Sequence, residues 1–404
     1  MTDNTDFHLD QQQLAEVALA MGEKVISGLN ANGEEIKCLP TYVPTSIVSG
    51  TQKAMVLDLG GSKLRSAIIS FNESASQIEK GPIETVMPWQ RNVPFDKKGF
   101  LGIQAELLAA LKPEPDLPLG YCFSYPAEPT LDRDAKLINW TKEIFVPDTE
   151  GHKIGRMLLA DLRTQEETIS CSNVTVINDT VASLFSGTIG PKVDAYIGLI
   201  VGTGTNMATF IDPDFIPKFS PSTTGWQGPI PVNLESGNFT PPYRTQWDRQ
   251  VDESSDDPEE QLFEKMVSGA YLGRVFKAVF PESKFDPSSG AAGLSKLING
   301  IIPANDSQVT IASKIYDRSA KLVGASIAGL IALLNKSRQL KKVRIIAEGG
   351  LFWAELDGAP YYSNLTKLTL ESILSSFGLA HVDVEFLKIQ NANLIGGALA
   401  ALAK

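Results

Sequence analysis

The sequence predicts a soluble α/β protein made of two lobes. Three observations support this prediction. The chain has 404 residues, which is too long for one ordinary core. Apolar, β-branched runs alternate with amphipathic runs, and one unit of strand, glycine turn and strand occurs twice. A charged fraction of 21% and a hydrophobic fraction of 43% are typical of globular proteins. The net charge of -11 argues against a nucleic-acid surface, which normally carries a basic stripe.

Cysteine usage and apolar runs predict the compartment. Cys38, Cys122 and Cys171 are scattered, so they suggest neither a disulfide framework nor a zinc site. The first residues, "MTDNTDFHLD", lack the basic-then-apolar pattern of a signal peptide. The longest apolar run, Leu322–Leu334, is too short to span a bilayer. We therefore expect a cytoplasmic protein with no membrane and no nucleic-acid partner.

The elements follow in order from an N-terminal helix. Apolar residues recur there at a helical period that ends before Asn30 and Gly33, namely Leu14, Val17, Met21, Val25 and Leu29. A link over 40–50 leads to the first hairpin. Apolar runs predict strands at Leu119–Ser124, Val174–Ile177, Ala195–Val201, Met207–Ile211 and Val343–Ala347. Amphipathic runs predict helices at Glu259–Phe280, Thr310–Asn335, Lys367–Phe377 and Asn391–Ala403.

Two hairpins share one pattern. "AMVLDLGGSKLRSAIISF" (54–71) carries Asp58 at the end of an apolar strand, where a buried carboxylate is costly unless something pairs with it. "LIVGTGTNMATFI" (199–211) aligns with 57–69 without a gap and sets Gly202 over Gly60. Closely spaced glycines let backbone N–H groups approach an anion. Two ordinary hairpins with tight turns are the alternative, and neither turn is a P-loop.

A strand followed by a helix lies between the hairpins. In "VTVINDTVASLFSG" (174–187) a buried-type strand stops at Asn178 and Asp179, and a helical run follows. Asp179 then stands at the carboxyl end of a strand, where ligands bind in open α/β sheets. An aspartate there also makes a good helix cap, but that interpretation leaves Asn178 unexplained. The acidic stretch Asp252–Glu260 predicts a solvated linker that ends in helix-starting acids.

Eight motifs, in this order, resemble those of the eukaryotic-type hexokinase family: "LDLGGSKLR", "FSYPAEP", "INWTKEI", "VINDTVASLFSG", "GLIVGTGTN", "VNLESGNF", "FEKMVSGAYLGRVF" and "AEGGLFW". The resemblance runs from about Leu57 to the C-terminus. It implies a two-lobed actin-like (ribonuclease H-like) ATPase fold with a cleft between a small domain, 46–176 plus 390–404, and a large domain, 1–45 plus 177–389. The implied activity is the ATP- and Mg²⁺-dependent phosphorylation of a hexose, glucose first, at its C6 hydroxyl, as in glycolysis. The lobes would close on sugar binding.

The resemblance also implies roles for single residues. Asp179 would be the general base, and Lys142 would offset charge on the moving phosphoryl group. The sugar would be ringed by Ser124, Thr141, Lys142, Asn178, Asp179, Asn206, Asn233, Glu235 and Glu264. The nucleotide would lie along Asp58, Gly60, Gly61, Ser62, Lys63, Arg65, Gly202, Thr203, Gly204, Gly349, Gly350 and Gly396. Mg²⁺ would meet Asp58 and Asp179 through water.

Ordinary alternatives exist for several of these residues. Ser124 could be a turn hydroxyl, Lys142 a solvated lysine and Glu264 an exposed helix glutamate. Close packing of a glycine-bearing helix would explain Gly396 nearly as well as a nucleotide does.

The chain departs from the family pattern in three places. It has Glu348-Gly349-Gly350 for the usual Asp-Gly-Ser, Ser236-Gly237 for Trp-Gly, and Glu143 for Gly. These departures leave the nucleotide and hexose preferences open.

Three other functions are alternatives to the hexokinase interpretation. They are a non-catalytic sugar-sensing protein on the same scaffold, a bacterial-type sugar kinase with a Cys-rich zinc motif, and an actin- or chaperone-like ATPase with no small acceptor. The chain could be a monomer or a homodimer.

Overall fold

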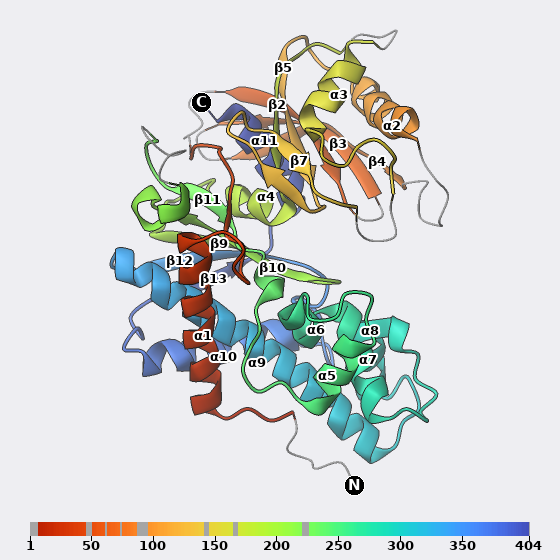
Figure 1. Cartoon of the computed structure of the whole chain (residues 1–404), viewed down its shortest axis with the longest axis vertical. Coiled ribbons are helices and arrows are strands. Elements are labelled where there is room, and N and C mark those ends of the chain that lie inside the picture. The colour runs from red at the N-terminus through yellow and green to blue at the C-terminus, as the bar shows by residue number, and fades with distance from the viewer. Residues whose placement is uncertain are drawn as a thin grey trace. The chain divides into compact units, whose positions relative to one another are not determined.

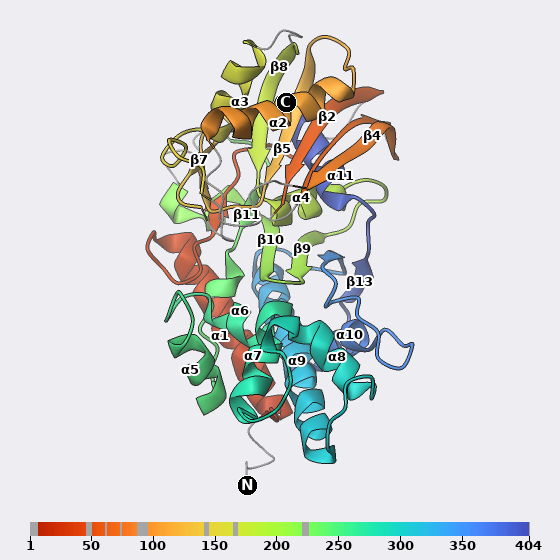
Figure 2. The ribbon, with the colours of Figure 1, turned by 90° about the vertical axis from the view of Figure 1, so that its right-hand side faces the viewer.

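The computed structural model describes residues 7–45, 51–60, 63–72, 75–86, 96–140, 145–164, 169–219 and 226–403. Of the expected site residues, Gly61, Ser62, Thr141 and Lys142 lie outside these ranges. Helices and strands alternate along the chain, as Figures 1 and 2 show, so the predicted α/β class is confirmed.

The helices and strands have the following bounds. The α-helices are α1 Gln11–Asn30, α2 Lys97–Ala110, α3 Ile154–Leu162, α4 Asp179–Ser186, α5 Gln246–Glu253, α6 Leu262–Val267, α7 Gly269–Val279, α8 Gly290–Ile298, α9 Asp306–Ser337, α10 Tyr361–Ser376 and α11 Ala392–Leu402. The strands are β1 Leu39–Pro40, β2 Gln52–Leu59, β3 Lys63–Phe71, β4 Ser76–Val86, β5 Leu117–Phe123, β6 Ala127–Pro129, β7 Ala135–Leu137, β8 Cys171–Ile177, β9 Ala195–Val201, β10 Thr205–Ile211, β11 Ile230–Asn233, β12 Lys342–Glu348 and β13 Asp383–Leu387. Short 3-10 turns occur at Pro213–Phe215, Pro217–Phe219, Ser236–Asn238 and Pro287–Ser289.

The chain divides into two compact units. Unit 1 comprises Met1–Cys38, Leu199–Met207 and Leu234–Phe386, and unit 2 comprises Leu39–Gly198, Ala208–Asn233 and Leu387–Lys404. These bounds differ from those of the two domains implied by the resemblance, which stay a prediction.

Unit 2 is built on a five-stranded sheet in the order β4-β3-β2-β5-β8. The predicted first hairpin is confirmed, because β2 pairs antiparallel with β3. On its other edge β2 pairs parallel with β5, and β5 pairs parallel with β8. The carboxyl ends of β2, β5 and β8 therefore meet at one edge of the sheet.

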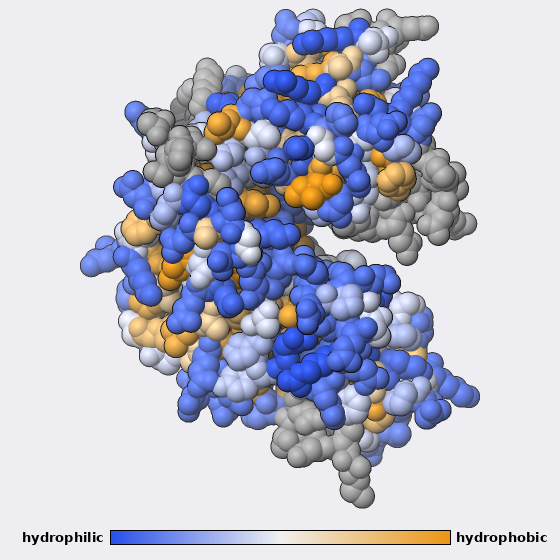
Figure 3. Space-filling model, viewed as in Figure 1, coloured by the Kyte–Doolittle hydropathy of each residue, from blue (hydrophilic) through white to orange (hydrophobic). Residues whose placement is uncertain are grey.

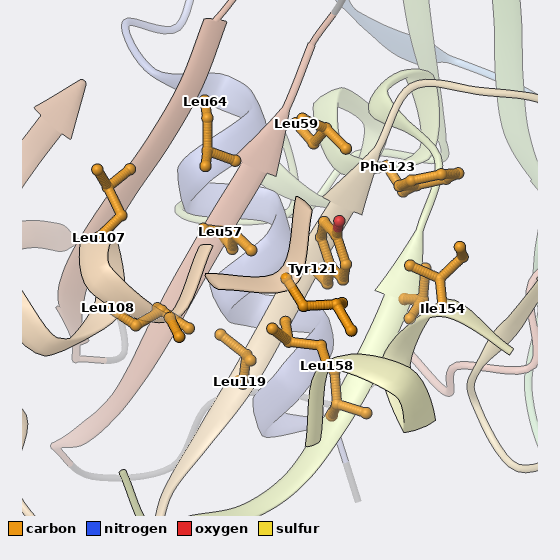
Figure 4. Close-up of a cluster of buried hydrophobic side chains, with 14 of the residues drawn as sticks. Leu57, Leu59, Leu64, Leu107, Leu108, Leu119, Tyr121, Phe123, Ile154 and Leu158 are labelled. Atoms are coloured by element: carbon orange, nitrogen blue, oxygen red, sulfur yellow. The ribbon is translucent and has the colours of Figure 1, made fainter. Parts of the chain in front are cut away.

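Alternating side chains cover the two faces of this sheet. One face carries Leu57 and Leu59 of β2 with Tyr121 and Phe123 of β5, which pack with residues of α2 and α3 such as Leu108 and Leu158 (Figure 4). The intervening Val56, Cys122 and Ile177 pack instead with residues of α4 and α11. By the same two-residue period, Asp58 lies on the face that α4 and α11 cover.

The long helix α9 forms the core of unit 1. It packs against α1 and α10, and the predictions of these three helices and of α11 are confirmed. By length and composition α9 could cross a membrane, but 72% of its most apolar window is buried inside the protein, as in the core helix of a globular domain. The face drawn in Figure 3 is mainly hydrophilic, with apolar side chains in small groups.

Two more sheets complete the described chain. The larger has six strands in the order β1-β11-β10-β9-β12-β13, and the smaller is the pair β6-β7. The second predicted hairpin provides β9 and β10, which are neighbours in the larger sheet.

The prediction of one helix over Glu259–Phe280 is wrong. The chain forms α6 and α7 with a break at Ser268, whose ψ of 156° is extended. At the break the Gly269 amide donates to the Gly202 carbonyl at 2.7 Å. A Cβ on Gly269 would lie 2.7 Å from the same oxygen, so the helix is interrupted where its backbone meets the second glycine turn.

The prediction of a solvated acidic linker is also wrong in part. Asp252 belongs to α5 and is only 5% exposed. Its carboxylate pairs with Lys265 at 2.8 Å and with Arg244 at 3.2 Å. Lys265 is itself buried and also pairs with Asp257 at 3.0 Å. Ionic partners elsewhere in unit 1 therefore bury Asp252, whereas most of the residues that follow it in this stretch are exposed.

Candidate active site

Three neighbouring strand ends bring together several expected site residues of unit 2. Asp58 of β2 is the register partner of Cys122 of β5, and Cys122 is the register partner of Ile177 of β8. The next residues along β5 and β8 include Ser124 and Asp179, so these side chains follow strand ends at one sheet edge. Two hydrogen bonds join that edge, from the Ser124 amide to the Leu59 carbonyl at 3.2 Å and from the Tyr125 hydroxyl to the Gly60 carbonyl at 3.0 Å.

Asp58 is the buried carboxylate of this edge. It is 3% exposed, and Arg65 donates to its Oδ2 from Nε at 3.0 Å and from Nη2 at 2.5 Å. Burial raises the pKa of Asp58; Arg65 opposes this increase, and the nearby Asp179 carboxylate adds to it. From the sequence this aspartate is expected to need a partner, and the resemblance implies that the partner is a hydrated divalent ion, which stays a prediction. In the structure Asp58 pairs with Arg65, the residue opposite it in the hairpin.

The donor set at Asp58 suits a hydrated divalent cation. No nitrogen or oxygen of the described residues hydrogen-bonds to the buried Oδ1 of Asp58. Within the described ranges there is no group of three or more His, Cys, Asp or Glu that could enclose a metal. Mg²⁺ typically binds through one or two carboxylates and keeps several waters and phosphate oxygens as ligands, so a single carboxylate here is compatible with it.

Asn178 and Asp179 have different positions and roles at the start of α4. Asn178 is the helix cap, since its Oδ1 accepts from the Thr180 amide at 2.9 Å. Asp179 is the first helical residue, and its Oδ1 accepts from the same amide at 2.8 Å. The cap interpretation of Asp179 is thereby corrected, and Asn178 is accounted for. The half-buried Asp179 carboxylate sits at a helix N-terminus, where the helix dipole favours negative charge.

A second group of polar residues surrounds the second glycine turn in unit 1. Glu264 Oε2 accepts from the Thr205 amide at 2.9 Å. Asn206 Oδ1 accepts from the Met207 amide at 2.8 Å and from the Ser236 amide at 3.1 Å. Glu235 precedes Ser236 in a left-handed conformation, with φ 57°. The expected sugar residues Asn206, Glu235 and Glu264 therefore belong to one local cluster.

Asn233 belongs to unit 2. It is 4% exposed in β11, opposite Ala208 of β10 and Leu39 of β1. The expected sugar residues thus come from both units, with Ser124, Asn178, Asp179 and Asn233 in unit 2.

The second glycine turn borders a pocket of about 670 Å³ within unit 1. The turn is held by bonds from the Gly202 amide to the Gly204 carbonyl at 2.9 Å and from the Ala270 amide to the Thr203 carbonyl at 3.2 Å. The residues that line the pocket include Gly202, Thr203, Gly269, Gly290, Lys296 and Gly350. The expected nucleotide residues Gly202, Thr203 and Gly350 therefore line the same pocket.

Sequence reasoning missed one wall of this pocket, the turn and helix start from Ser288 to Lys296. The signal was present in "DPSSG" (286–290), a Pro, Ser and Gly turn of the kind that precedes a helix. Gly349 supports the opposite wall with φ 106°, and a side chain there would clash with the Val201 backbone.

Two expected nucleotide residues have other partners. Lys63 forms a 2.6 Å ion pair with Glu84 on the neighbouring strand β4, and both side chains are exposed. Gly396 lies in α11, where a Cβ would clash with the Ala182 backbone of α4. Packing between the two helices therefore accounts for this glycine without a nucleotide.

Comparisons with known proteins match most of the chain. Two sequence models, both described as hexokinase, match residues 4–189 and residues 196–283 with 302–403. Hexokinase-2 of Solanum tuberosum is 27% identical, covering 96% of this chain and 87% of that protein. Hexokinase-3 of Homo sapiens is 26% identical over 91% of this chain but only 43% of that protein, so the chain spans under half of that relative. The solved structure of a Schistosoma mansoni hexokinase complexed with glucose has the same fold, with a TM-score of 0.76, 23% identity, and coverage of 99% and 96%.

Proposed function

Because the chain belongs to the hexokinase family, which uses ATP as co-substrate, we propose that it transfers the terminal phosphoryl group of ATP to the C6 hydroxyl of a hexose, with glucose as the first candidate. The observation that carries the proposal is the pair of carboxylates, Asp58 and Asp179, at the carboxyl ends of β2 and β8, two parallel strands that lie on either side of β5 in unit 2. One carboxylate can serve the metal side of the nucleotide and the other the acceptor hydroxyl.

Asp179 is the proposed general base. Phosphoryl transfer has a loose transition state, so the protein mainly positions groups, neutralises charge and accepts the proton of the alcohol. Since Asn178 caps α4, the Asp179 carboxylate is not required as the cap. A carboxylate that accepts the C6 hydroxyl proton contributes roughly 10²–10⁴-fold to the rate.

The sugar would be bound by amides and carboxylates. A hexose presents hydroxyls that both donate and accept hydrogen bonds, and carboxylate and amide groups can pair with them. Ser124, Asn178 and Asn233 of unit 2 and Asn206, Glu235 and Glu264 of unit 1 are the described residues with this chemistry. Lys142 would add positive charge near the phosphoryl group; it lies outside the described residues.

The nucleotide would use the glycine turns and the pocket of unit 1. The Thr203 backbone amide can approach a phosphate closely because no Cβ stands at the flanking Gly202 and Gly204. The 670 Å³ pocket is of a size that suits a nucleoside. Asp58 would hold Mg²⁺ through water, and Mg²⁺, when bound, supplies charge neutralisation on the phosphates.

Closure of the protein around the sugar is part of the proposal. Water competes with the sugar as acceptor, so the site should assemble only when sugar is bound. Small-angle scattering should show a smaller radius of gyration with glucose than without it, and an unchanged radius would contradict closure. Function in the cytoplasm likewise remains our proposal.

The test of the function is ADP release with MgATP and a panel of glucose, mannose, fructose and glucosamine, alongside a reaction without sugar. We expect ADP only when a hexose is present, and a hexose 6-phosphate as the product. ADP release without sugar would identify an ATPase instead. Sugar binding without ADP would support the alternative, a non-catalytic sugar-sensing protein.

The test of the base is Asp179→Asn, with Asp214→Asn as control because Asp214 is exposed in a 3-10 turn. Asp179→Asn should lose roughly 10²–10⁴-fold in turnover while still binding glucose by calorimetry. Near wild-type turnover would remove Asp179 from the mechanism.

A further inference from the structure

Arg65 is paired with Asp58, the carboxylate to which the proposed function assigns the metal. The two residues face each other across the hairpin, since Asp58 of β2 is the register partner of Arg65 of β3. Two guanidinium nitrogens, Nε and Nη2, converge on the same oxygen, Oδ2, at 3.0 Å and 2.5 Å. The hairpin register places the two side chains side by side on one face of the sheet.

This ion pair compensates a buried charge. The Asp58 side chain is 5% exposed and the Arg65 side chain 26% exposed. An ionised carboxylate at this depth is costly without a cation beside it. In the described part of the chain, Arg65 is the cation that bonds to Asp58. The other basic residues of the hairpin, Lys53 and Lys63, are paired with glutamates.

Arg65 is better placed to move than Asp58. Among the described residues, its remaining nitrogen, Nη1, makes only a long contact of 3.4 Å with Asn391 Oδ1 at the start of α11. A planar guanidinium binds a phosphate through two parallel hydrogen bonds, which are stronger than ordinary ones. A second cation at Asp58 would be repelled by Arg65 as long as the ion pair holds.

We propose that Arg65 makes divalent-cation binding at Asp58 conditional on the nucleotide. Without phosphate, the guanidinium holds the carboxylate and keeps a free cation out. When a polyphosphate binds, its oxygens replace Asp58 as the acceptors of the guanidinium hydrogen bonds. Asp58 then becomes available to the cation that the polyphosphate carries. The site would thus select the metal–nucleotide complex over either component alone. This inference rests on the proposed function only for the identity of the ligand.

The test measures binding of Mn²⁺ alone, by the loss of its free-ion EPR signal, without nucleotide or sugar. Wild type should bind Mn²⁺ weakly. Arg65→Met, which keeps the length and removes the charge, should bind it roughly tenfold more tightly or better. Arg65→Lys should stay close to wild type. Arg65→Met combined with Asp58→Asn should lose the gain, because the carboxylate is gone.

Controls separate this effect from net charge and from misfolding. Arg163→Met removes one exposed charge at the end of α3 and should leave Mn²⁺ binding unchanged. Arg65→Gln offers a second neutral variant if Arg65→Met melts early. Equal Mn²⁺ binding by wild type and by a folded neutral variant would overturn the inference, and so would tight binding by wild type.

A second arm adds the non-hydrolysable nucleotide AMPPNP. The nucleotide should strengthen Mn²⁺ binding in wild type far more than in Arg65→Met, and equal strengthening in the two proteins would overturn the inference. Neither arm requires turnover. A protein that fails the ADP assay but passes the Mn²⁺ test would refute the proposed function and leave this inference standing.

Discussion

Glu264 accepts a hydrogen bond from the Thr205 backbone amide at 2.9 Å. The residue expected from sequence to bind sugar therefore also fixes the second glycine turn, and the fit is close, since a Cβ on Gly204 would lie 2.5 Å from the same carboxylate oxygen. Glu264 lies in the first turn of the short helix α6. The following residue, the buried Lys265, anchors that helix through ion pairs with Asp252 and Asp257. The residues of unit 1 that are expected to bind sugar and nucleotide are thus held in place by the same contact.

Replacing Glu264 should affect both substrates. Glu264→Ala removes the acceptor of the Thr205 amide, and a buried donor left without a partner costs about 1–3 kcal/mol. We expect the KM values for hexose and for ATP to rise together, measured by ADP release. Glu264→Gln retains a carbonyl oxygen for the amide, so it should raise the hexose KM more than the ATP KM. A Glu264→Ala enzyme with an unchanged ATP KM would contradict the shared support.

The break between α6 and α7 should tolerate no side chain. In Gly269→Ala the new Cβ would meet the Gly202 carbonyl at 2.7 Å, and relieving such overpacking costs about 1–3 kcal/mol. Because Gly202 borders the pocket, we expect a several-fold rise in the ATP KM and a lower melting temperature. Gly102→Ala is the matched control, since its Cβ on α2 would meet no atom within 4 Å. That change should be neutral or stabilise by about 0.5–1 kcal/mol.

Much of this site could be predicted from sequence because it rests on local patterns. The hairpin register that opposes Asp58 to Arg65 follows from two apolar arms and a glycine turn, and the strand end before Asn178 follows from the switch between periods of two and 3.6. The same patterns could not reveal the break at Ser268. A periodic run predicts a continuous helix, and the interruption comes from a contact with Gly202, which is distant in sequence.

The burial of Asp252 shows the same limit. An acidic stretch is soluble by composition, and only the placement of Lys265 and Arg244 around it brings its carboxylate inside. The sequence pattern also could not show which of Asn178 and Asp179 caps the helix, because either residue type can do so. Side-chain geometry decides which of them does so.

The buried pair of Asp248 and Arg318 should govern the acid stability of unit 1. Both guanidinium nitrogens Nη1 and Nη2 donate at 2.7 Å to the carboxylate. Asp248→Ala leaves the Arg318 charge buried and unpaired, which costs about 3–5 kcal/mol. Glu371→Ala, on an exposed pair of α10, should change the free energy of unfolding by well under 1 kcal/mol. Urea denaturation measures both, and similar losses in the two variants would contradict the prediction.

The same pair predicts how the stability of the folded protein changes with pH. Burial opposes the ionisation of Asp248, but Arg318 and Thr245 outweigh it and hold the pKa of Asp248 below its usual value. The stabilisation is therefore complete above the pKa of the unfolded chain, about 4, and is lost as pH falls through the lower folded value. Wild type should lose stability in acid more steeply than Asp248→Ala. Parallel stability curves below about pH 4 would show that other carboxylates control the loss.

The three cysteines should be unreactive in the folded protein. Burial raises the pKa of the Cys122 thiol well above its usual value, and the Asp58 and Asp179 carboxylates add to the increase. Burial also raises the pKa of the half-exposed Cys171 to about 11, and Cys38 is buried. Since the thiolate is the reactive form, Ellman's reagent at pH 8 should label all three cysteines quickly only in guanidinium.

Residual labelling of the native protein should come from Cys171 and disappear in Cys171→Ser. Cys122 should react only as unit 2 opens, because its side chain packs between the sheet and the helices α4 and α11. As Cys122 is the register partner of Asp58, its labelling and the loss of ADP release should then follow one rate. Fast native labelling of Cys122 with full retention of activity would show that this strand is not the closed support of Asp58 described above.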